Sequence, residues 1–300
     1  PVAAEISSTL QAYKKIFVLG ARSFMAYTYS PQSPMPDGSD LLHLSADSNA
    51  VAMTFATQWG GVGDIKASLR SLIGSINVLD SSETQRHIDA KAQKKKRAWA
   101  TRQTQLQAAL PDSPIKPETA SYAFVQSLPD DAIVVDEAPA NTFSIRELLQ
   151  TKHAGQYHFS KGGGLGWAMP VAVGISLDNK DKRTFCLTGD GAAMYSPQAM
   201  WTAANQSLPI TYVVFNNSEY GVLKNYLRKT FPENGERDDF IGMDINTPAI
   251  DYQALAASMG IPSVKVDDAN KIGNAVAQSI SENRSGPSLI EIMIAPSGDV

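Results

Sequence analysis

An acidic residue and an amide each follow an apolar segment with the composition of a buried strand. Asp190 stands between two glycines directly after Thr184–Thr188, and Asn217 follows Ile210–Phe215. Parallel strands joined by a helix end at the same edge of a sheet, where open α/β sheets bind their ligands. The two side chains are therefore predicted to meet in one crevice.

The residue types in this crevice predict a metal-diphosphate site. Carboxylate and amide oxygens are hard ligands, and Mg2+ takes a few of them and completes its coordination with water and phosphate oxygens. Gly189 and Gly191 would let the backbone approach the phosphates and point its amides at the anion. A Gly-Asp-Gly turn or an Asn-Asn pair alone is common in loops, so the prediction depends on the two motifs together.

The segment between the motifs has the pattern of a short helix. Ser196 is predicted to cap this helix, and Pro197 suits its first position. Met200 and Ala204 then lie on an apolar face. Residues 184–215 are therefore predicted to form a strand, a helix and a second strand.

This pairing resembles the signature of thiamine diphosphate-dependent enzymes, a GDG followed later in the chain by NN, which is found in decarboxylases and synthases of 2-oxo acids. Gly163–Pro170 resembles the GGLG segment of that family, and Asn216–Gly221 resembles its N-N-x-x-Y-G continuation. The sequences around Trp201 and along Gly286–Glu291 are most similar to those of the benzoylformate decarboxylases. The implied cofactors are thiamine diphosphate and Mg2+.

The resemblance implies a role for individual residues at the metal. Asp190 and Asn217 would bind Mg2+ through their side chains. Glu219 would contribute its backbone carbonyl, and its side chain is expected to be solvated.

The resemblance also implies how the cofactor is held. Leu165 resembles the bulky residue over which the cofactor bends, and Gly163 would offer a carbonyl to the cofactor's amino group. Ala140 occupies a place where the family often has a hydroxyl for the diphosphate. The complete cofactor-binding set implied is Gly163, Leu165, Gly189, Gly191, Ala192 and Ala140.

Substrate and proton-transfer positions follow from the same resemblance. Phe159, Val222 and Tyr226 resemble positions on the substrate side of benzoylformate decarboxylases, although each could be ordinary core. Tyr27 occupies a place where those enzymes have a catalytic histidine. A phenol titrates near ~10 and is a poorer proton shuttle than imidazole at neutral pH.

Other sites and partners are less consistent with the sequence. A dinucleotide fold requires G-x-G-x-x-G, and the third position is Trp167 after Gly164 and Met194 after Gly191, so a nicotinamide enzyme is a weak alternative. The basic run Lys91–Arg97 reads as a solvated helical connector, so no nucleic acid is expected as partner. None of the four histidines has metal-ligand spacing to another, and a structural role is preferred for His158.

The composition is that of an α/β protein with room for two units: 300 residues, 43% hydrophobic, 19% charged, with a net charge of −4. The one cysteine, Cys186, lies in an apolar strand, so no disulfide forms within the chain. Neither a membrane-spanning run nor a signal sequence is apparent. A cytoplasmic protein without a membrane partner is expected.

The predicted fold is a parallel-sheet thiamine diphosphate-binding fold preceded by part of a second α/β, Rossmann-like domain. Residues 1–85 would be the partial middle domain, 86–116 a helical connector, and 117–300 the domain that binds diphosphate and Mg2+. Strands are predicted at residues 15–19, 41–45, 132–135, 184–188, 210–215, 264–266 and 288–294.

The resemblance covers only the later part of such enzymes, so a fragment is inferred that lacks the pyrimidine-binding domain and its activating glutamate. The intact protein would be a homodimer or tetramer that decarboxylates 2-oxo acids, aromatic ones included, through a C2 carbanion and an enamine. A carboligating synthase resembling acetolactate synthase is the alternative. The fragment alone is expected to be inactive, a noncatalytic module that binds a metal-diphosphate ligand.

Overall fold

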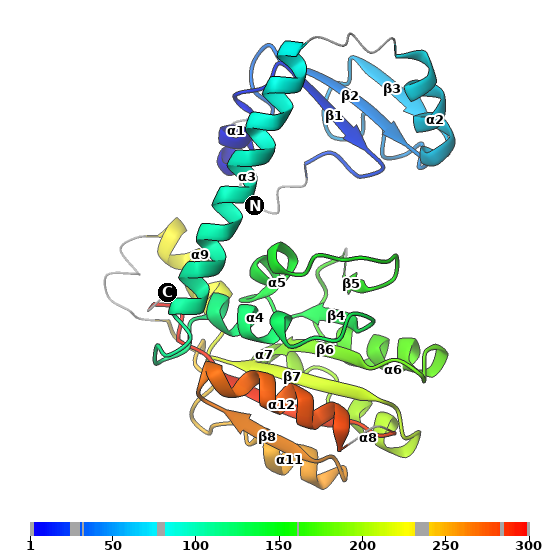
Figure 1. The fold of residues 1–300 in the computed structure, drawn as a ribbon. Helices are drawn as coiled ribbons and strands as arrows, with labels where there is room; N and C mark the ends of the chain where they lie inside the picture. The colour runs from blue at the N-terminus through cyan, green and yellow to red at the C-terminus, as the bar shows by residue number, and fades with distance from the viewer. Residues whose placement is uncertain are drawn as a thin grey trace. The chain divides into compact units, whose positions relative to one another are not determined.

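The computed structural model describes residues 3–24, 31, 33–76, 82–160, 162–231, 240–282 and 285–298. The chain divides into two compact units, Pro1–Lys91 and Ala92–Val300 (Figure 1). None of the helices in these described ranges is long and apolar enough to cross a membrane. The functional division at residues 85 and 116 stays a prediction.

The first unit contains a parallel three-stranded sheet in the order β1-β2-β3. Ile16 and Val18 alternate along β1 and pack on Leu41 of β2, which makes a small core. The first two strands confirm the prediction, whereas β3 was missed because two of its four residues are glycines. The elements are α1 (Ala3–Leu10), β1 (Lys15–Leu19), β2 (Asp40–Ser45), β3 (Trp59–Val62) and α2 (Ile65–Ser75).

A long polar helix, α3 (Ser82–Ala108), contains the basic run Lys91–Arg97. The residues of that run are exposed. This helix begins before residue 86 and ends before residue 116, and the connector predicted for residues 86–116 stays a prediction.

The second unit is built on a six-stranded sheet in the order β5-β4-β6-β7-β9-β8, and every neighbouring pair is parallel. The strands are β4 (Ile133–Glu137), β5 (Tyr157–Phe159), β6 (Thr184–Gly189), β7 (Ile210–Asn216), β8 (Ser263–Val266) and β9 (Ser288–Met293). All of them except β5 had been predicted. The Tyr-His-Phe of β5 is too short to show a period of its own.

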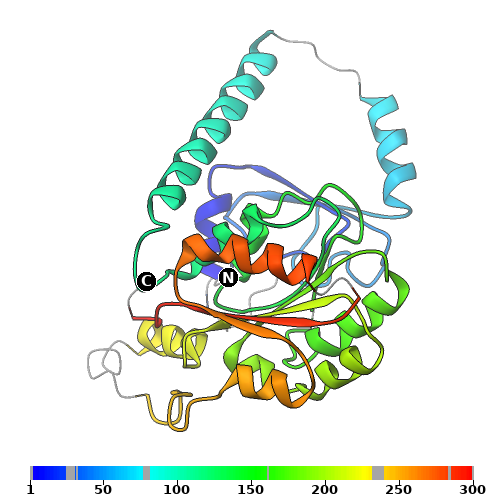
Figure 2. The ribbon, with the colours of Figure 1, turned by 60° about the horizontal axis from the view of Figure 1, so that its bottom comes forward.

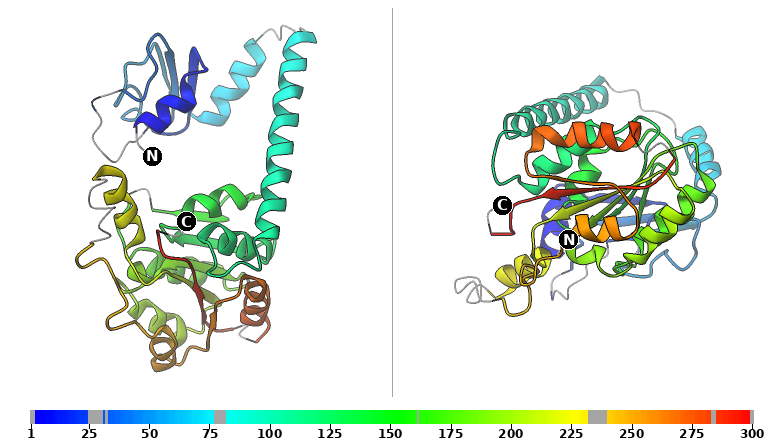
Figure 3. Two further views of the ribbon diagram at one scale, coloured as in Figure 1. Left: turned by 90° about the vertical axis from the view of Figure 1, so that its left-hand side faces the viewer. Right: turned by 90° about the horizontal axis from the view of Figure 1, so that it is seen from below.

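Helices cover both faces of this sheet, and the two layers lie on opposite sides of the strands in Figures 2 and 3. One face carries α4 (Pro117–Gln126), α5 (Thr142–Leu148) and α12 (Ala269–Ser281). The other carries α6 (Ala168–Asp178), α8 (Gln198–Asn205) and α11 (Tyr252–Ser258). Burial on both sides explains why all seven residues of β7 are buried and why its sequence is a continuous apolar run.

Aromatic side chains fill the centre of the first of these layers. The ring of Phe124 meets Phe185 edge-on at a centroid distance of 5.7 Å and Phe215 at 6.3 Å. Edge-to-face pairs of this kind add about 0.5–1.5 kcal/mol beyond the burial of their area. Phe124 thus fixes α4 over the two central strands.

The predicted cap of α8 is wrong. Pro197 occupies the N-cap position, and Ser196 makes no capping hydrogen bond. The Ser196 hydroxyl donates instead to the carbonyl of Gly166, at 2.7 Å. The hydroxyl thus donates to a carbonyl of a distant loop instead of accepting a backbone N–H of its own helix, which the spacing of residues could not indicate.

Arg183 ties three strands together at the amino-terminal edge of the sheet. Its guanidinium donates to Thr211 Oγ1 on β7 at 2.8 Å and to Ser288 Oγ on β9 at 2.8 Å. It also donates to the carbonyl of Gly286, at 3.0 Å. Burial lowers the pKa of this guanidinium to about 10.

Replacing this arginine with a side chain of similar length should destabilise the chain. In Arg183→Met the hydroxyls and the carbonyl lose a charged donor while they stay buried, and we expect a loss of about 2–4 kcal/mol in the free energy of unfolding. Urea denaturation followed by circular dichroism measures the change. The matched control is Lys180→Met, at an exposed position, and an equal loss in both variants would contradict the role assigned to Arg183.

Candidate functional site

The two sequence motifs lie together at the carboxyl edge of the sheet. Strands β6 and β7 are neighbours in register, with Gly189 opposite Phe215, so Asp190 and Asn217 follow adjacent strand ends. Both side chains line one cavity of about 340 Å³. The cavity is lined by Ala138, Pro139, Ala140, Asn141, Gly163, Leu165, Gly189, Asp190, Gly191, Ala192, Phe215, Asn217, Glu219, Tyr220, Gly221, Val222 and Leu223.

Asp190 carries an acceptor that no described group satisfies. The residue begins the short helix α7 (Asp190–Ala193) and is only 4% exposed. Its Oδ1 accepts the amide of Gly191 at 2.8 Å, whereas Oδ2 is buried without a partner. Burial raises the pKa of Asp190 to about 6, against the opposing effect of the nearby amides of Gly191, Ser218 and Glu219. A buried oxygen of this kind calls for a donor or a cation.

The two adjacent asparagines have different roles. Asn216 is held inside the sheet, since its amide donates to Glu291 Oε1 at 2.6 Å and its oxygen accepts the backbone N–H of Ser218 at 2.8 Å. Ser218 adopts a left-handed backbone with φ of 59°. This turn leaves Asn217 on the cavity wall, where its Oδ1 accepts a long hydrogen bond of 3.4 Å from the amide of Glu219.

The Glu219 side chain is buried, so the expectation that it is solvated is wrong. Lys224 donates to one carboxylate oxygen at 2.6 Å, and the amide of Ser297 donates to the other at 2.6 Å. The same ammonium contacts Asp244 at 2.6 Å. Burial by itself would raise the pKa of Glu219, but the hydrogen bonds from Lys224 and Ser297 outweigh it and hold this pKa below its usual value. With both side-chain oxygens engaged, the backbone carbonyl is the group left for a ligand.

Two glycines next to the site are required by close packing. A Cβ on Gly191 would lie 2.6 Å from the ring of Tyr220, and one on Gly221 would lie 2.6 Å from Nδ2 of Asn217. A Cβ on Gly189 would meet only Pro139, at 3.7 Å. Of the two glycines that flank Asp190, only Gly191 is therefore fixed by its neighbours.

A buried carboxylate missed in the sequence supports the glycine-rich loop. Glu137 ends β4, and its oxygens accept the backbone amides of Gly166 and, at 2.7 Å, of Ala168. Burial raises the pKa of Glu137, although these two amides oppose the shift. The available signal was a pair of acids at the end of an apolar strand.

The structure gathers most of the predicted site residues and leaves others apart. Ala140, Ala192 and Val222 line the cavity with the residues above, whereas Phe159 and Tyr226 are not among the lining residues. The ring of Phe159 lies under the guanidinium of Arg146, at 3.7 Å. Tyr27 falls outside the described residues. The roles assigned to all these positions stay predictions.

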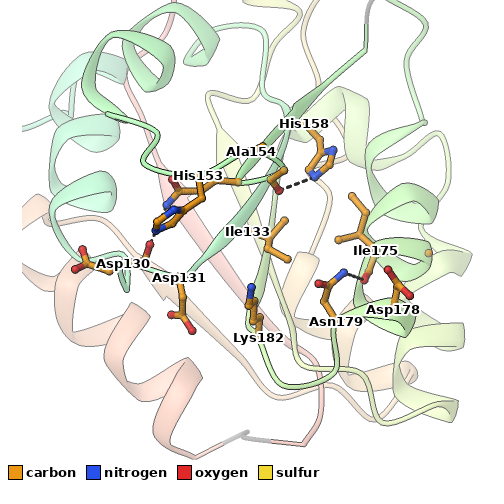
Figure 4. Close-up of a pocket in the computed structure, with 13 residues that line it drawn as sticks. Asp130, Asp131, Ile133, His153, Ala154, His158, Ile175, Asp178, Asn179 and Lys182 are labelled. Carbon is orange, nitrogen blue, oxygen red and sulfur yellow. Dashed lines mark hydrogen bonds between the residues drawn. The ribbon is translucent and has the colours of Figure 1, made fainter. Parts of the chain in front are cut away.

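Another cavity, of about 440 Å³, lies at the opposite, amino-terminal edge of the same sheet (Figure 4). It is lined by Ile133 at the start of β4 and by Asp178 and Asn179 at the end of α6. His158 also lines it and is hydrogen-bonded to the carbonyl of Gly155 at 2.9 Å. This cavity is larger than the one at the carboxyl edge, but its position argues against it as the ligand site, because ligands of open α/β sheets bind at the carboxyl edge.

A further cavity, of about 760 Å³, belongs to the first unit. It is lined by apolar residues and serines, among them Phe17, Trp59 and Leu72. These side chains offer neither a charge nor a metal ligand. The cavity at the carboxyl edge of the second unit therefore remains the candidate site.

Comparison with known families agrees with this choice. Residues 140–292, more than half of the chain, match the model of the C-terminal TPP-binding domain of thiamine pyrophosphate enzymes. The chain belongs to this family. The matched segment contains both motifs and nearly all of the lining residues of the cavity.

Individual relatives of this thiamine pyrophosphate enzyme are similar over almost the whole chain. The chain is 27% identical to a benzoylformate decarboxylase of Pseudomonas aeruginosa, over 96% of its own length and 50% of that protein. It is 25% identical to a putative acetolactate synthase large subunit of Mycobacterium tuberculosis, with the same coverage. The chain thus spans about half the length of the curated relatives that it matches.

A solved structure gives the same picture of the fold. A thiamine diphosphate-dependent 4-hydroxybenzoylformate decarboxylase of Rhodococcus jostii RHA1 superposes with a TM-score of 0.77 at 25% identity. The superposition covers 98% of this chain and 51% of that one. The parallel-sheet thiamine diphosphate-binding fold predicted from the sequence is confirmed.

Removal of the buried ammonium behind the site should destabilise the second unit. In Lys224→Met the carboxylate of Glu219 stays buried without its cation, and we expect the free energy of unfolding to fall by about 3–5 kcal/mol. Guanidinium denaturation measures the loss. Lys271→Met, which removes an exposed and weakly paired lysine, should change stability by less than about 0.5 kcal/mol. A Lys224→Met variant as stable as this control would show that the ion pair is dispensable.

Proposed function

We propose that this chain is the diphosphate-binding half of a thiamine diphosphate-dependent enzyme that decarboxylates 2-oxo acids. The observation that carries the proposal is the unsatisfied Oδ2 of buried Asp190, next to Asn217 in a cavity at the carboxyl edge of the sheet. Family membership and the benzoylformate decarboxylase relative support the reaction type.

The donor set suits a Mg2+ ion that is bound together with a diphosphate. Asp190 and Asn217 would hold it through side-chain oxygens, and Glu219 through its backbone carbonyl. Among the described residues there is no group of three or more His, Cys, Asp or Glu placed to hold a metal. An ion here would therefore take its other ligands from diphosphate and water, as Mg2+ commonly does.

The organic cofactor would lie along the rest of the cavity wall. When bound, thiamine diphosphate would supply a nucleophilic ring carbon for the 2-oxo group and a cationic ring that can take up the electrons released on decarboxylation. Gly191 and Ala192 would bring backbone amides to its diphosphate. Leu165 and Gly163 would hold the ring end, and Val222 would keep water from it.

The remainder of the active site is proposed to come from other parts of the protein. The cofactor's pyrimidine ring needs a binding domain and an activating carboxylate, and we assign these to the half of the relatives that this chain does not span. The intact protein would be a homodimer or tetramer in the cytoplasm, with Phe159, Tyr226 and Tyr27 on its substrate side.

Carboligation is the second candidate function. The similarity to an acetolactate synthase large subunit covers as much of the chain as the similarity to the decarboxylase. Both reactions release carbon dioxide from a 2-oxo acid, and they differ in whether a proton or a second carbonyl compound then adds to the carbon that carried the carboxylate. The residues of this chain that line the cavity are compatible with either reaction.

Loss of either proposed metal ligand should weaken Mg2+-dependent cofactor binding. We expect the Kd of thiamine diphosphate, measured by isothermal titration calorimetry with Mg2+, to rise by more than about tenfold in Asp190→Ala and Asn217→Ala. Asp178→Asn, in the cavity at the opposite edge, is the control and should bind normally. Binding that is indifferent to both substitutions, or to chelation of Mg2+, would refute the metal-diphosphate site.

Product analysis separates the two reactions. The intact protein with Mg2+ and thiamine diphosphate is expected to convert benzoylformate to an aldehyde, and the 300-residue chain alone to convert neither benzoylformate nor pyruvate. Gas chromatography of the products is the measurement. Acetolactate from pyruvate as the main product would favour the second candidate, and turnover by the chain alone would show that the activating group lies within it.

A further inference from the structure

The last two residues of β4 are both buried acids, and they serve different segments. Asp136 accepts the amide of Ala138 at 3.0 Å and the hydroxyl of Tyr157 at 2.7 Å. Glu137 accepts the amides of Gly166 and Ala168. Successive residues of a strand point to opposite faces of the sheet, which explains the division.

Glu137 is only 6% exposed, and no lysine or arginine of the described part of the chain forms a salt bridge with it. A buried carboxylate without a cation is expensive unless hydrogen bonds compensate it. Here both oxygens are used on two amides of a single loop, which begins at Gly163 and enters α6 at Ala168. Both carboxylate oxygens of Glu137 therefore hold the backbone of that loop in place.

The same loop is held from its other side. The carbonyl of Gly166 accepts the hydroxyl of Ser196 at 2.7 Å. Gly166 has φ of 89°, and a Cβ on it would lie 2.7 Å from Cβ of Tyr195. The peptide groups on both sides of the Gly166 Cα are therefore fixed, one by Glu137 and the other by Ser196.

The residue before this fixed glycine is the one that faces the cavity. Leu165 lines the cavity and is 43% exposed. Its own side chain has little packing to hold it in place, so its position depends on the backbone of the loop. The metal-diphosphate residues Asp190 and Asn217 lie on other segments, after β6 and β7.

We propose that Glu137 is a positioning residue that, with Ser196, clamps the loop of residues 163–168 and so holds Leu165 and Gly163 against the organic part of thiamine diphosphate. The inference rests on the proposed function. It divides recognition of the cofactor into two independent parts, a metal site for the diphosphate and a clamped apolar loop for the rings.

The first test concerns the loop without any ligand. Hydrogen exchange of the amides in residues 163–168 should be faster by roughly tenfold in Glu137→Gln and in Ser196→Ala, since each loses one net hydrogen bond. Tyr157→Phe is the matched control, because it removes a buried hydrogen bond from the other acid of β4. Unchanged exchange in both clamp variants would overturn the inference.

The second test compares two ligands by calorimetry in the presence of Mg2+. In Glu137→Gln and Ser196→Ala the Kd of thiamine diphosphate should rise by about tenfold, as expected for one lost positioning contact, while the Kd of inorganic pyrophosphate should stay within about twofold. A merely structural role would weaken both ligands equally. That result, or equal affinity for thiamine diphosphate in all variants, would refute the inference.

The failure of the proposed function can be told apart from failure of the clamp. An unsubstituted chain that binds neither ligand refutes the proposed function and the inference with it. An unsubstituted chain that binds thiamine diphosphate no more tightly than Glu137→Gln refutes the clamp alone. Should Glu137→Gln fail to fold, Ser196→Ala still decides between these outcomes.

Discussion

The parallel register of β4, β6 and β7 is the constraint on which the site depends. Glu137 pairs with Thr188, and Gly189 pairs with Phe215, so three consecutive strands end within a residue or two of one another at one edge. A polar residue lies at the end of each strand: Glu137 is the last residue of β4, and Asp190 and Asn217 directly follow β6 and β7. A slip of one strand relative to its neighbours would therefore separate these side chains. Burial of both faces by helices fixes the register and thereby assembles the cavity.

The chain compensates its buried acids around this edge in different ways. Glu219 is neutralised by Lys224, and Glu137 is stabilised by backbone amides. Asp190 has a partner for only one of its two oxygens. An unsatisfied buried acceptor lowers stability, so its presence at the cavity supports the metal-diphosphate site that we propose there.

The sequence predicted the parts of the fold and site that depend on local pattern. Apolar runs located the two strands that precede Asp190 and Asn217, and the glycines marked the turns. Contacts between distant segments could not be predicted: Glu137 meets Gly166 across 29 residues and Ser196 meets Gly166 across 30. The ion pair of Glu219 was missed for a similar reason, because its lysine reaches it only through the turn into α9 (Gly221–Thr230).

The polar groups of the cavity also bear on which steps of the proposed reaction its lining residues could serve. Asn141 donates its amide to Pro117 and Ser121 while its Oδ1 is buried without a partner, and the carboxylate of Glu219 is engaged by Lys224 and Ser297. Asp190 and Asn217 are the residues that we propose hold the metal, and much of the remaining wall is glycine, alanine and larger apolar side chains. Such a wall can orient a cofactor and exclude water, but it offers few groups for proton transfer to a substrate. We therefore expect the acid–base residues of the proposed reaction on segments outside this lining.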